Sequence, residues 1–235
     1  MKCDLHIHTC YSYDSNAQVK DIVETAIKKG IDCLAITDHG ETKGAEEAIN
    51  YAKGKSILII PGLEIKSKEG DILGLNIRTI IPNRLSAKET VRRIKEAGGM
   101  AIVPHPFAWF CAFTPFRNRR FLTGFKGKLK DFINEIDGIE VLNASIFGPG
   151  NKKAFEFSQK FNLAFTCGSD VHFPEFLGKA YLEIPGENLS IEEILKAIKE
   201  KRGKIGGQEA GFFEKIIDHS KRNLVKSSKI IKKLC

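Results

Sequence analysis

Short apolar runs that alternate with amphipathic helical patterns constrain the fold of this chain more than any other feature. Residues 3–7, 33–36 and 57–61 read as strands, and residues 19–29 and 45–53 read as helices. This rhythm is typical of a parallel sheet or barrel covered by helices. At 235 residues the chain is long enough for one α/β barrel, and we favour a single catalytic domain over two small ones.

The rest of the chain continues this pattern with one interruption. Further helices are expected at 86–97, 129–136, 151–161 and 191–199, and further extended segments at 72–77, 80–82, 100–103, 138–142, 163–166 and 180–183. Residues 107–128 combine many aromatic side chains with three arginines, so this segment is a candidate lid, dimer contact or base-stacking platform. We therefore expect a barrel over residues 1–211 that includes this segment.

Residues 212–235 read as a separate Lys-rich amphipathic helix. Such a helix either packs on the barrel with a solvated lysine face or serves as a nucleic-acid-binding arm. We favour the packed helix.

Composition narrows the class of protein. The net charge of +8 favours an anionic partner such as a phosphate ester or nucleic acid. Six cysteines are scattered without a CxxC pair and read as reduced thiols. No stretch approaches the roughly 20 apolar residues of a membrane span, and no signal peptide precedes the first strand. We expect a cytoplasmic protein without membrane contact; the sequence does not indicate its oligomeric state.

Five of the six histidines lie in segments that look suited to present metal ligands. His6 and His8 stand two residues apart at the end of the first strand, so their side chains share one face of it. The other candidates follow later strands, at the rim where parallel barrels carry their chemistry. Because such a polar cluster would be unpaired without a cation, the sequence predicts a metal site. The candidates after later strands are Asp38, His39, Glu64, His105, Asp170 and His172. His219 stands apart and reads as a surface residue.

These segments resemble the motifs of the PHP (polymerase and histidinol phosphatase) superfamily, including its PHP-associated C-terminal part. That family has an HxH, a TDH, a PGxE turn, an HP and a terminal SDxH in this order. Here they stand as His6-Ile7-His8, Thr37-Asp38-His39, Pro61-Gly62-Leu63-Glu64, His105-Pro106 and Ser169-Asp170-Val171-His172. The resemblance implies a distorted (β/α)7 TIM-like barrel of the PHP type, within the α/β class.

The resemblance also implies two or three divalent metal ions, with Zn, Mn or Fe as candidates and Mg as a further option. It assigns one metal to His6, His8, Glu64 and Asp170, a second to Glu64 and His105, and a third to Asp14, His39 and His172. Asp71 stands where some relatives have a histidine, so it is an additional candidate ligand. Glu64 and Asp170, with Asp38 and Glu140, are the candidate catalytic residues, and Thr37, Asp38 and Glu140 are expected to orient ligands or water.

The implied chemistry is hydrolysis of a phosphate ester by a metal-activated water. Arg117, Arg119 and Arg120 are the candidate substrate-binding residues, because guanidinium groups bind phosphate bidentately. We expect a nucleotide or oligonucleotide end as substrate, as in nucleoside bisphosphate phosphatases or 5'-3' exoribonucleases. Two alternatives stay open, namely a histidinol-phosphate phosphatase and a non-catalytic nucleic-acid-binding subunit of PHP-like fold.

Overall fold

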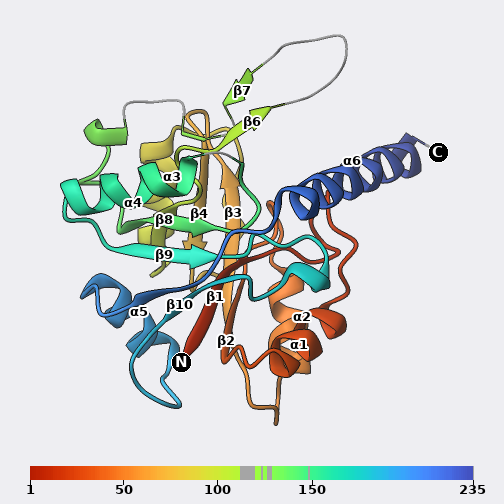
Figure 1. Cartoon of the computed structure of the whole chain (residues 1–235), viewed down its shortest axis with the longest axis horizontal. Coiled ribbons are helices and arrows are strands. Elements are labelled where there is room, and N and C mark those ends of the chain that lie inside the picture. The colour runs from red at the N-terminus through yellow and green to blue at the C-terminus, as the bar shows by residue number, and fades with distance from the viewer. Residues whose placement is uncertain (112–119, 123, 126–128, 148, 235) are drawn as a thin grey trace.

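The computed structural model describes residues 1–111, 120–122, 124–125, 129–147 and 149–234. Most of them form a mixed nine-stranded sheet that curls towards a closed barrel, with helices outside it (Figure 1). The strand order is β11-β10-β1-β2-β3-β4-β5-β8-β9. The bounds of these strands are β1 Lys2–Ile7, β2 Cys33–Ile36, β3 Leu58–Lys66, β4 Asp71–Leu75, β5 Met100–Val103, β8 Gly138–Asn143, β9 Phe165–Gly168, β10 Ala180–Glu183 and β11 Lys204–Gly207.

The helices cover the sheet in groups. Figure 1 shows α1 and α2 side by side next to β1 and β2, α3 and α4 near β4, β5 and β8, and α6 reaching beyond the barrel at its C-terminal end. A separate hairpin of two short strands, β6 and β7, projects from the barrel. The bounds of these elements are α1 Val19–Lys28, α2 Lys43–Tyr51, α3 Ala87–Glu96, β6 Trp109–Cys111, β7 Arg120–Leu122, α4 Gly150–Lys160, α5 Ile191–Lys199 and α6 Phe212–Leu234, with single 3₁₀ turns η1 Leu129–Asp131 and η2 Pro174–Phe176.

Local sequence explains where two of these helices begin. The hydroxyls of Ser86 and Ser190 accept the backbone N–H groups of Glu89 and Glu193, which lie in the first turns of α3 and α5. At Ser190 the Glu193 carboxylate also accepts the N–H of the capping residue, which completes a capping box. Such caps each contribute about 1 kcal/mol because they satisfy N–H groups that the helix itself leaves without a partner.

The apolar core forms two clusters. Side chains such as Leu5, Ile102 and Ile139 pack in one cluster beneath α3 and α5, whereas Ile22 and Leu34 belong to a second cluster under α1 and α2. Each fully buried side chain of this size contributes about 1.5–3 kcal/mol. The strands are thus held from both flanks, which gives the ends of β1, β2 and β3 fixed positions.

The barrel nearly closes at the end of β1. The N–H of Asp170 donates to the carbonyl of His6 (2.9 Å), and the N–H of His8 donates to the carbonyl of Val171 (3.0 Å). Ile7 and Val171 form a parallel bridge between these bonds. This contact places the segment after β9 directly against the first strand, although the two are far apart in the chain.

The α/β barrel expectation is confirmed, but the sheet is not wholly parallel. β4 pairs antiparallel with both β3 and β5, and β10 pairs antiparallel with β1. Glu64 was expected in a turn after a strand ending at residue 61, whereas it lies within β3, opposite Leu73 of β4. The antiparallel partner supplies ladder hydrogen bonds beyond residue 61, so the strand continues to Lys66.

Other expected elements also differ. The helix expected at 129–136 is only the single turn η1, because turns follow at 132–135 and the backbone already bonds to β5 from Asp137, whose N–H donates to the Ala101 carbonyl. Residues 80–82 form no strand, and β9 begins at Phe165 rather than at residue 163. β11 was not predicted. No helix in the described part of the chain is long and apolar enough to cross a membrane.

Candidate metal centre

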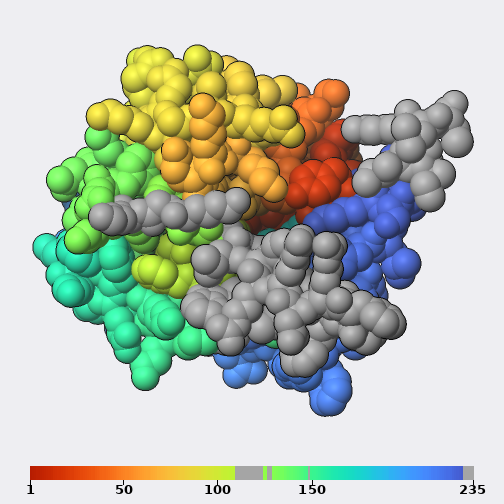
Figure 2. All heavy atoms as spheres, turned by 90° about the horizontal axis from the view of Figure 1, so that it is seen from above, coloured from red at the N-terminus to blue at the C-terminus, as the bar shows by residue number. Residues whose placement is uncertain are grey.

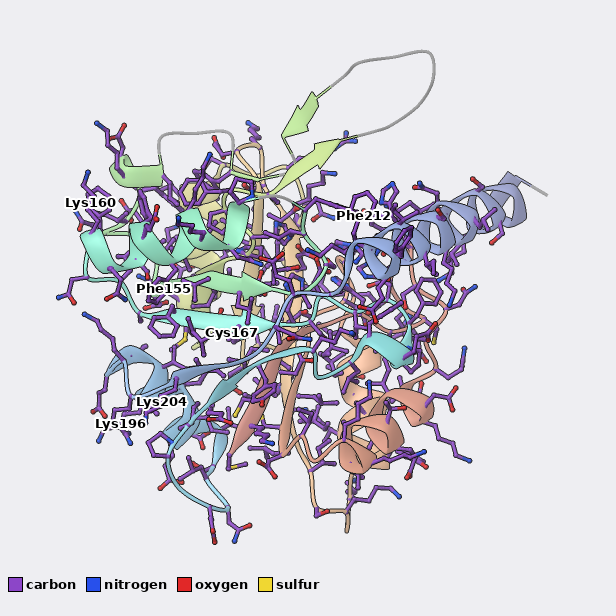
Figure 3. The ribbon with its side chains drawn as sticks, viewed as in Figure 1. Phe155, Lys160, Cys167, Lys196, Lys204 and Phe212 are labelled. Atoms are coloured by element: carbon purple, nitrogen blue, oxygen red, sulfur yellow. The ribbon has the colours of Figure 1, made fainter. Side chains whose placement is uncertain are left out.

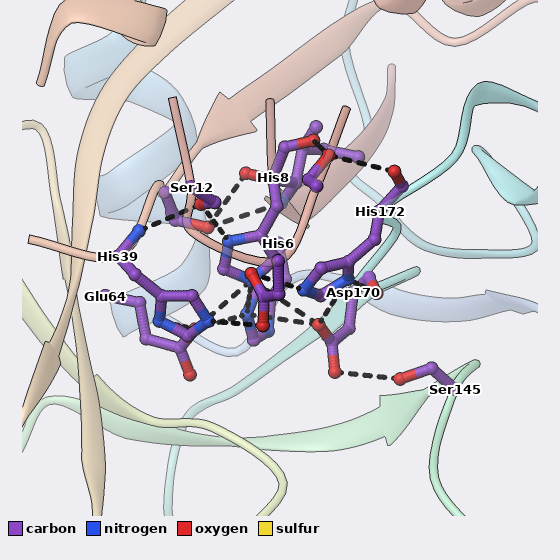
Figure 4. Close-up of polar contacts among 12 residues, drawn as sticks. His6, His8, Ser12, His39, Glu64, Ser145, Asp170 and His172 are labelled. Carbon is purple, nitrogen blue, oxygen red and sulfur yellow. Dashed lines mark hydrogen bonds and ion pairs between the residues drawn. The ribbon is translucent and has the colours of Figure 1, made fainter. Parts of the chain in front are cut away.

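The side chains of the opening strand meet the carboxylates of two other segments. The Nε2 atoms of His6 and His8 lie 3.2 Å apart. The Nε2 atom of His8 lies 3.1 Å from Glu64 Oε2 and 3.4 Å from Asp170 Oδ1. These side chains are almost completely buried, and Figure 4 shows them pointing toward one another. Asp170 reaches the first strand because the segment after β9 pairs with β1.

Four further candidates, His39, His105, His172 and Asp14, surround this group. His105 Nε2 lies 3.4 Å from Glu64 Oε1, and His39 Nδ1 lies 3.2 Å from Glu64 Oε2. His39 Nε2 and His172 Nε2 lie 3.4 and 3.3 Å from the two carboxylate oxygens of Asp14. The two oxygens of Glu64 therefore face different imidazoles, which is the arrangement of a bridging carboxylate.

The donor atoms fall into three overlapping groups. Within the described residues, each group has its donor atoms within 4.8 Å of one another. The resemblance implied a different division, because in the structure His6 and His8 each belong to two groups. Asp14 lies against the group of His8, His39 and His172 but does not belong to it. The groups are His6–His8–Asp170, His6–Glu64–His105 and His8–His39–His172.

Asp71 is placed at the margin of the centre. It begins β4 and lines the same cavity as the imidazoles, but none of the three groups among the described residues includes it. Burial raises the pKa of its carboxyl, and the nearby Glu64 carboxylate adds to this shift. The structure thus brings Asp71 near the site without bringing its carboxylate into the ligand groups.

Neighbouring side chains set the orientation of the imidazoles. His6 Nδ1 lies 3.1 Å from Glu140 Oε1, His8 Nδ1 lies 3.0 Å from Ser12 Oγ, and His172 Nδ1 lies 3.1 Å from the carbonyl of Asp170. With Nδ1 protonated and donating to these oxygens, each Nε2 presents its lone pair to the centre. Glu140 therefore lies where it can orient the imidazole of His6, a candidate ligand.

Asp38 acts through Ser12 and Thr9. Its Oδ1 accepts the Ser12 hydroxyl (2.7 Å) and the N–H of Thr9 (2.6 Å), and its Oδ2 accepts the Thr9 hydroxyl (2.6 Å). Gly44 leaves room for this pair, since a Cβ there would lie 2.0 Å from Asp38 Oδ2. Asp38 contacts no candidate ligand atom directly, so its place in the structure is that of a positioning group.

Sequence reasoning missed several supporting residues. Asn143 Nδ2 donates to Glu140 Oε2 (2.9 Å) and to Asp170 Oδ2 (3.2 Å), and the Ser145 hydroxyl donates to the same Asp170 oxygen (2.8 Å). These residues lie at and just after the end of β8. Their position after an apolar strand was the available signal, but a single Asn or Ser there is common in ordinary turns.

Two candidate ligands have unusual backbone conformations. His105 has φ of 30° and Asp170 has φ of 50°, a region that residues other than glycine seldom adopt. The His105 N–H is held by Glu140 Oε2 (2.9 Å), and the Asp170 N–H is held by the His6 carbonyl. The surrounding hydrogen bonds therefore fix both residues in conformations that point their side chains into the centre.

Burial and neighbouring charges shift the pKa values of the cluster in opposite directions. Burial alone would lower the pKa of His8 and of His105, but the carboxylates beside them outweigh it and raise both values to about 9. Burial would raise the pKa of Glu64, yet the imidazoles hold it well below its usual range. Burial and the Arg222 guanidinium lower the pKa of His172 to about 3. The Glu64 carboxylate is therefore ionised, as a metal ligand must be, whereas His8 and His105 would have to lose a proton to bind a metal.

The donor set fits a divalent metal. Among the described residues, His172 Nε2 and Asp14 Oδ1 are buried side-chain atoms that lie 3.3 Å apart without forming a hydrogen bond to each other or to another group. Buried polar atoms without partners are costly, and a bound cation satisfies such atoms. Imidazole nitrogens combined with carboxylate oxygens suit zinc, manganese or iron.

A cavity of about 490 Å³ opens above the centre. One of its walls comes from α6 and carries Lys215, Asp218, His219, Arg222 and Lys226. His219, which the sequence placed at the surface, is half-buried and lines this wall.

The helix expected at the C-terminus is present, although its lysines are not all solvated. Lys215 is 6% exposed and forms an ion pair with Glu209 at 2.7 Å. This helix therefore packs on the barrel with part of its cationic face turned to the cavity.

The three arginines predicted to bind substrate lie in a segment whose side chains the structure does not describe. Arg117 and Arg119 lie outside the described residues, and the side chain of Arg120 in β7 is likewise outside what the structure describes. At the described ends of the candidate lid, Phe107 and Phe125 pack on Phe157 and Phe132. These two rings are thus part of the packing of the barrel and not a base-stacking platform.

Comparison with known proteins identifies the family. A PHP domain model matches residues 4–102, and a PHP-associated model matches residues 148–202. An uncharacterized protein of Methanocaldococcus jannaschii is 38% identical over an alignment of 154 residues, and the match covers 61% of this chain and 82% of that protein. A 5'-3' exoribonuclease of Haemophilus influenzae is 31% identical over an alignment of 105 residues, and the match covers 43% of this chain and 38% of that enzyme.

A solved structure supports the same assignment at the level of fold. It is a two-domain protein from Bacteroides vulgatus containing a predicted PHP-like metal-dependent phosphoesterase, with a TM-score of 0.71 and 19% identity. The match covers 88% of this chain and 65% of that one. With its motifs in order on this fold and both family models matched, the chain belongs to the PHP domain family.

Proposed function

We propose that this protein is a metal-dependent phosphoesterase that hydrolyses phosphate esters at the candidate metal centre, in the cavity that α6 helps to line. One observation carries the proposal. Imidazoles and carboxylates from separate strand ends converge in three overlapping groups, and within each group the donor atoms lie within 4.8 Å of one another. Such a cluster is costly unless it binds cations, and paired cations are well suited to phosphoryl chemistry.

Divalent cations in such a centre neutralise phosphoryl charge and lower the pKa of water to about 7. The chain contributes the geometry. His6 and His8 are held with Nε2 toward the centre by Glu140 and Ser12, and Glu64 offers one oxygen to each side. The chain thus holds these donors in place before the substrate arrives, which reduces the reorganisation needed during reaction.

A nucleotide or an oligonucleotide end is the proposed substrate. The net charge of +8 favours an anion, and a cavity of about 490 Å³ lies in the range of small-molecule sites. The similarity to an exoribonuclease over 105 residues supports the same class. Arg117, Arg119 and Arg120 remain proposed contacts to the phosphate.

The test is phosphate release from a panel of substrates with added manganese or zinc. The panel contains nucleoside bisphosphates, short RNA with a 5' phosphate, and histidinol phosphate. We expect metal-dependent turnover of the nucleotides that is lost in His8→Ala. Equal turnover of parent and His8→Ala would refute the proposal, and a metal-free protein that binds RNA tightly without hydrolysis would indicate a nucleic-acid-binding subunit instead.

A further inference from the structure

Helix α6 lies beyond both family matches, yet it forms part of the cavity. The PHP and PHP-associated models end at residues 102 and 202, whereas α6 spans Phe212–Leu234. In Figure 2 the blue C-terminal region lies against a red patch of N-terminal residues. The helix therefore adds to the site from outside the part of the chain that the family models match.

Two basic residues fasten α6 to the loops of the metal centre. The Lys229 ammonium donates to the carbonyls of Cys10 (2.8 Å), Ser12 (2.7 Å) and Ser15 (2.7 Å). These carbonyls flank Asp14 in the chain. Such charge-assisted hydrogen bonds are stronger than neutral ones, so they hold the helix in register with the loop.

Arg222 makes the second attachment. Its Nη2 donates to the carbonyl of Asp170 at 3.0 Å, and its Nε lies 2.6 Å from Asp218 Oδ2. The guanidinium is 15% exposed and is engaged by these two groups. Arg222 therefore serves as a positioning residue that links α6 to a candidate ligand.

Lys226 differs from both, since its ammonium reaches the cavity from a partly open position. It lies 3.4 Å from Asp14 Oδ2 and 5.3 Å from the centre of the Tyr13 ring, with 35% of its side chain exposed. Lys66 and Lys68 line the same cavity from the β3–β4 hairpin. An anion in the cavity would thus meet positive charge both from α6 and from the hairpin.

We propose that Lys226 of α6 binds the phosphoryl group of the substrate and so makes α6 a specificity element for anions. This inference rests on the proposed function, because it names a contact in the same site. The Asp14 carboxylate would be shared between Lys226 and any cation held there, so the ammonium at this end of the cavity can turn to an incoming anion. Its flexible stem and partial exposure allow this small movement.

The test compares Lys226→Gln with Lys221→Gln in the full-length protein loaded with manganese. Lys221 is on the same helix, pairs with Glu175 at the surface and does not line the cavity, so it is a matched control. A second control is Lys196→Gln on α5, which projects from the side of the molecule away from α6 (Figure 3). Calorimetry measures the affinity for inorganic phosphate and, separately, for Mn²⁺.

We expect Lys226→Gln to weaken phosphate binding about tenfold, the lower end of what a hydrogen bond to a charged group contributes. Its affinity for Mn²⁺ should be unchanged or higher, because a positive charge beside Asp14 has been removed. Both control variants should stay within twofold of the parent in both measurements. Lys226→Arg should restore most of the phosphate affinity.

Three outcomes would overturn the inference. They are a phosphate affinity of Lys226→Gln within twofold of the parent, a parallel loss of phosphate and Mn²⁺ affinity, which indicates a merely structural role, and a parent that does not bind phosphate at millimolar concentration. Phosphate binding that depends on Lys226 in a protein without turnover would instead uphold this inference and refute the proposed function.

Discussion

Replacing Ser12 by alanine should disturb the candidate metal centre without touching a proposed ligand. Its hydroxyl is fully buried and joins three groups. It donates to Asp38 Oδ1 (2.7 Å), accepts from the N–H of His39 (3.1 Å) and lies 3.0 Å from His8 Nδ1. In Ser12→Ala, therefore, two donors and one carboxylate oxygen lose a partner.

The expected loss of stability follows from these contacts. A buried polar group left without a partner costs about 1–3 kcal/mol. Asp38 keeps the two hydrogen bonds from Thr9, and the His39 N–H is only partly buried, so about 2–4 kcal/mol is expected for the variant. Because His8 also loses the group that fixes its ring, metal affinity should fall about 10- to 100-fold.

Urea denaturation with a chelator measures the first quantity, and calorimetric titration with Mn²⁺ measures the second. Ser158→Ala is the matched control, because Ser158 is equally buried but its hydroxyl donates, within the described part of the chain, only to the Phe155 carbonyl of α4. It should cost less than about 1 kcal/mol and leave metal affinity unchanged. The reasoning is refuted if Ser12→Ala matches Ser158→Ala in both measurements.

Three further predictions concern the same region. Gly44→Ala places a Cβ 2.0 Å from Asp38 Oδ2 and should lower the free energy of unfolding by about 1–3 kcal/mol, so an unchanged denaturation midpoint would contradict the packing described. The raised pKa of His8 and His105, about 9 in each, stabilises the metal-free protein fully below about pH 6.5, and this stabilisation is lost as the pH rises to about 9. Since metal binding displaces these protons, Mn²⁺ affinity should increase over that range with proton release in calorimetry, and a flat profile would argue against these imidazoles as ligands. Lys229→Met removes three donations to loop carbonyls, so hydrogen exchange of the α6 amides should become faster, whereas unchanged exchange would show that the helix is held by other contacts.

The sequence predicted those candidate ligands that lie at or just after the ends of apolar strands. His6 and His8 share a strand face, and His39, His105 and Asp170 follow apolar runs, so their convergence could be predicted from a barrel alone. The motif order then indicated the family. The positions of such residues can be predicted from neighbouring residues in the sequence, without knowledge of tertiary contacts.

Other features depend on contacts that local patterns do not encode. Glu64 is in a strand because β4 pairs with β3, and that pairing is a tertiary choice. Arg222 and Lys226 reach the site because a C-terminal helix folds back on loops near the N-terminus. From the sequence alone, their spacing showed only an amphipathic helix with lysines, and not which face turns to the cavity.

The central claim is that this cluster holds divalent cations, and anomalous scattering tests it most directly. Crystals grown with manganese should show anomalous difference peaks within coordination distance of His6 and His8 Nε2, Glu64 and Asp170. Further peaks are expected beside His105 and beside His39 and His172. Peaks confined to other parts of the surface, or none in crystals grown with excess metal, would contradict the account.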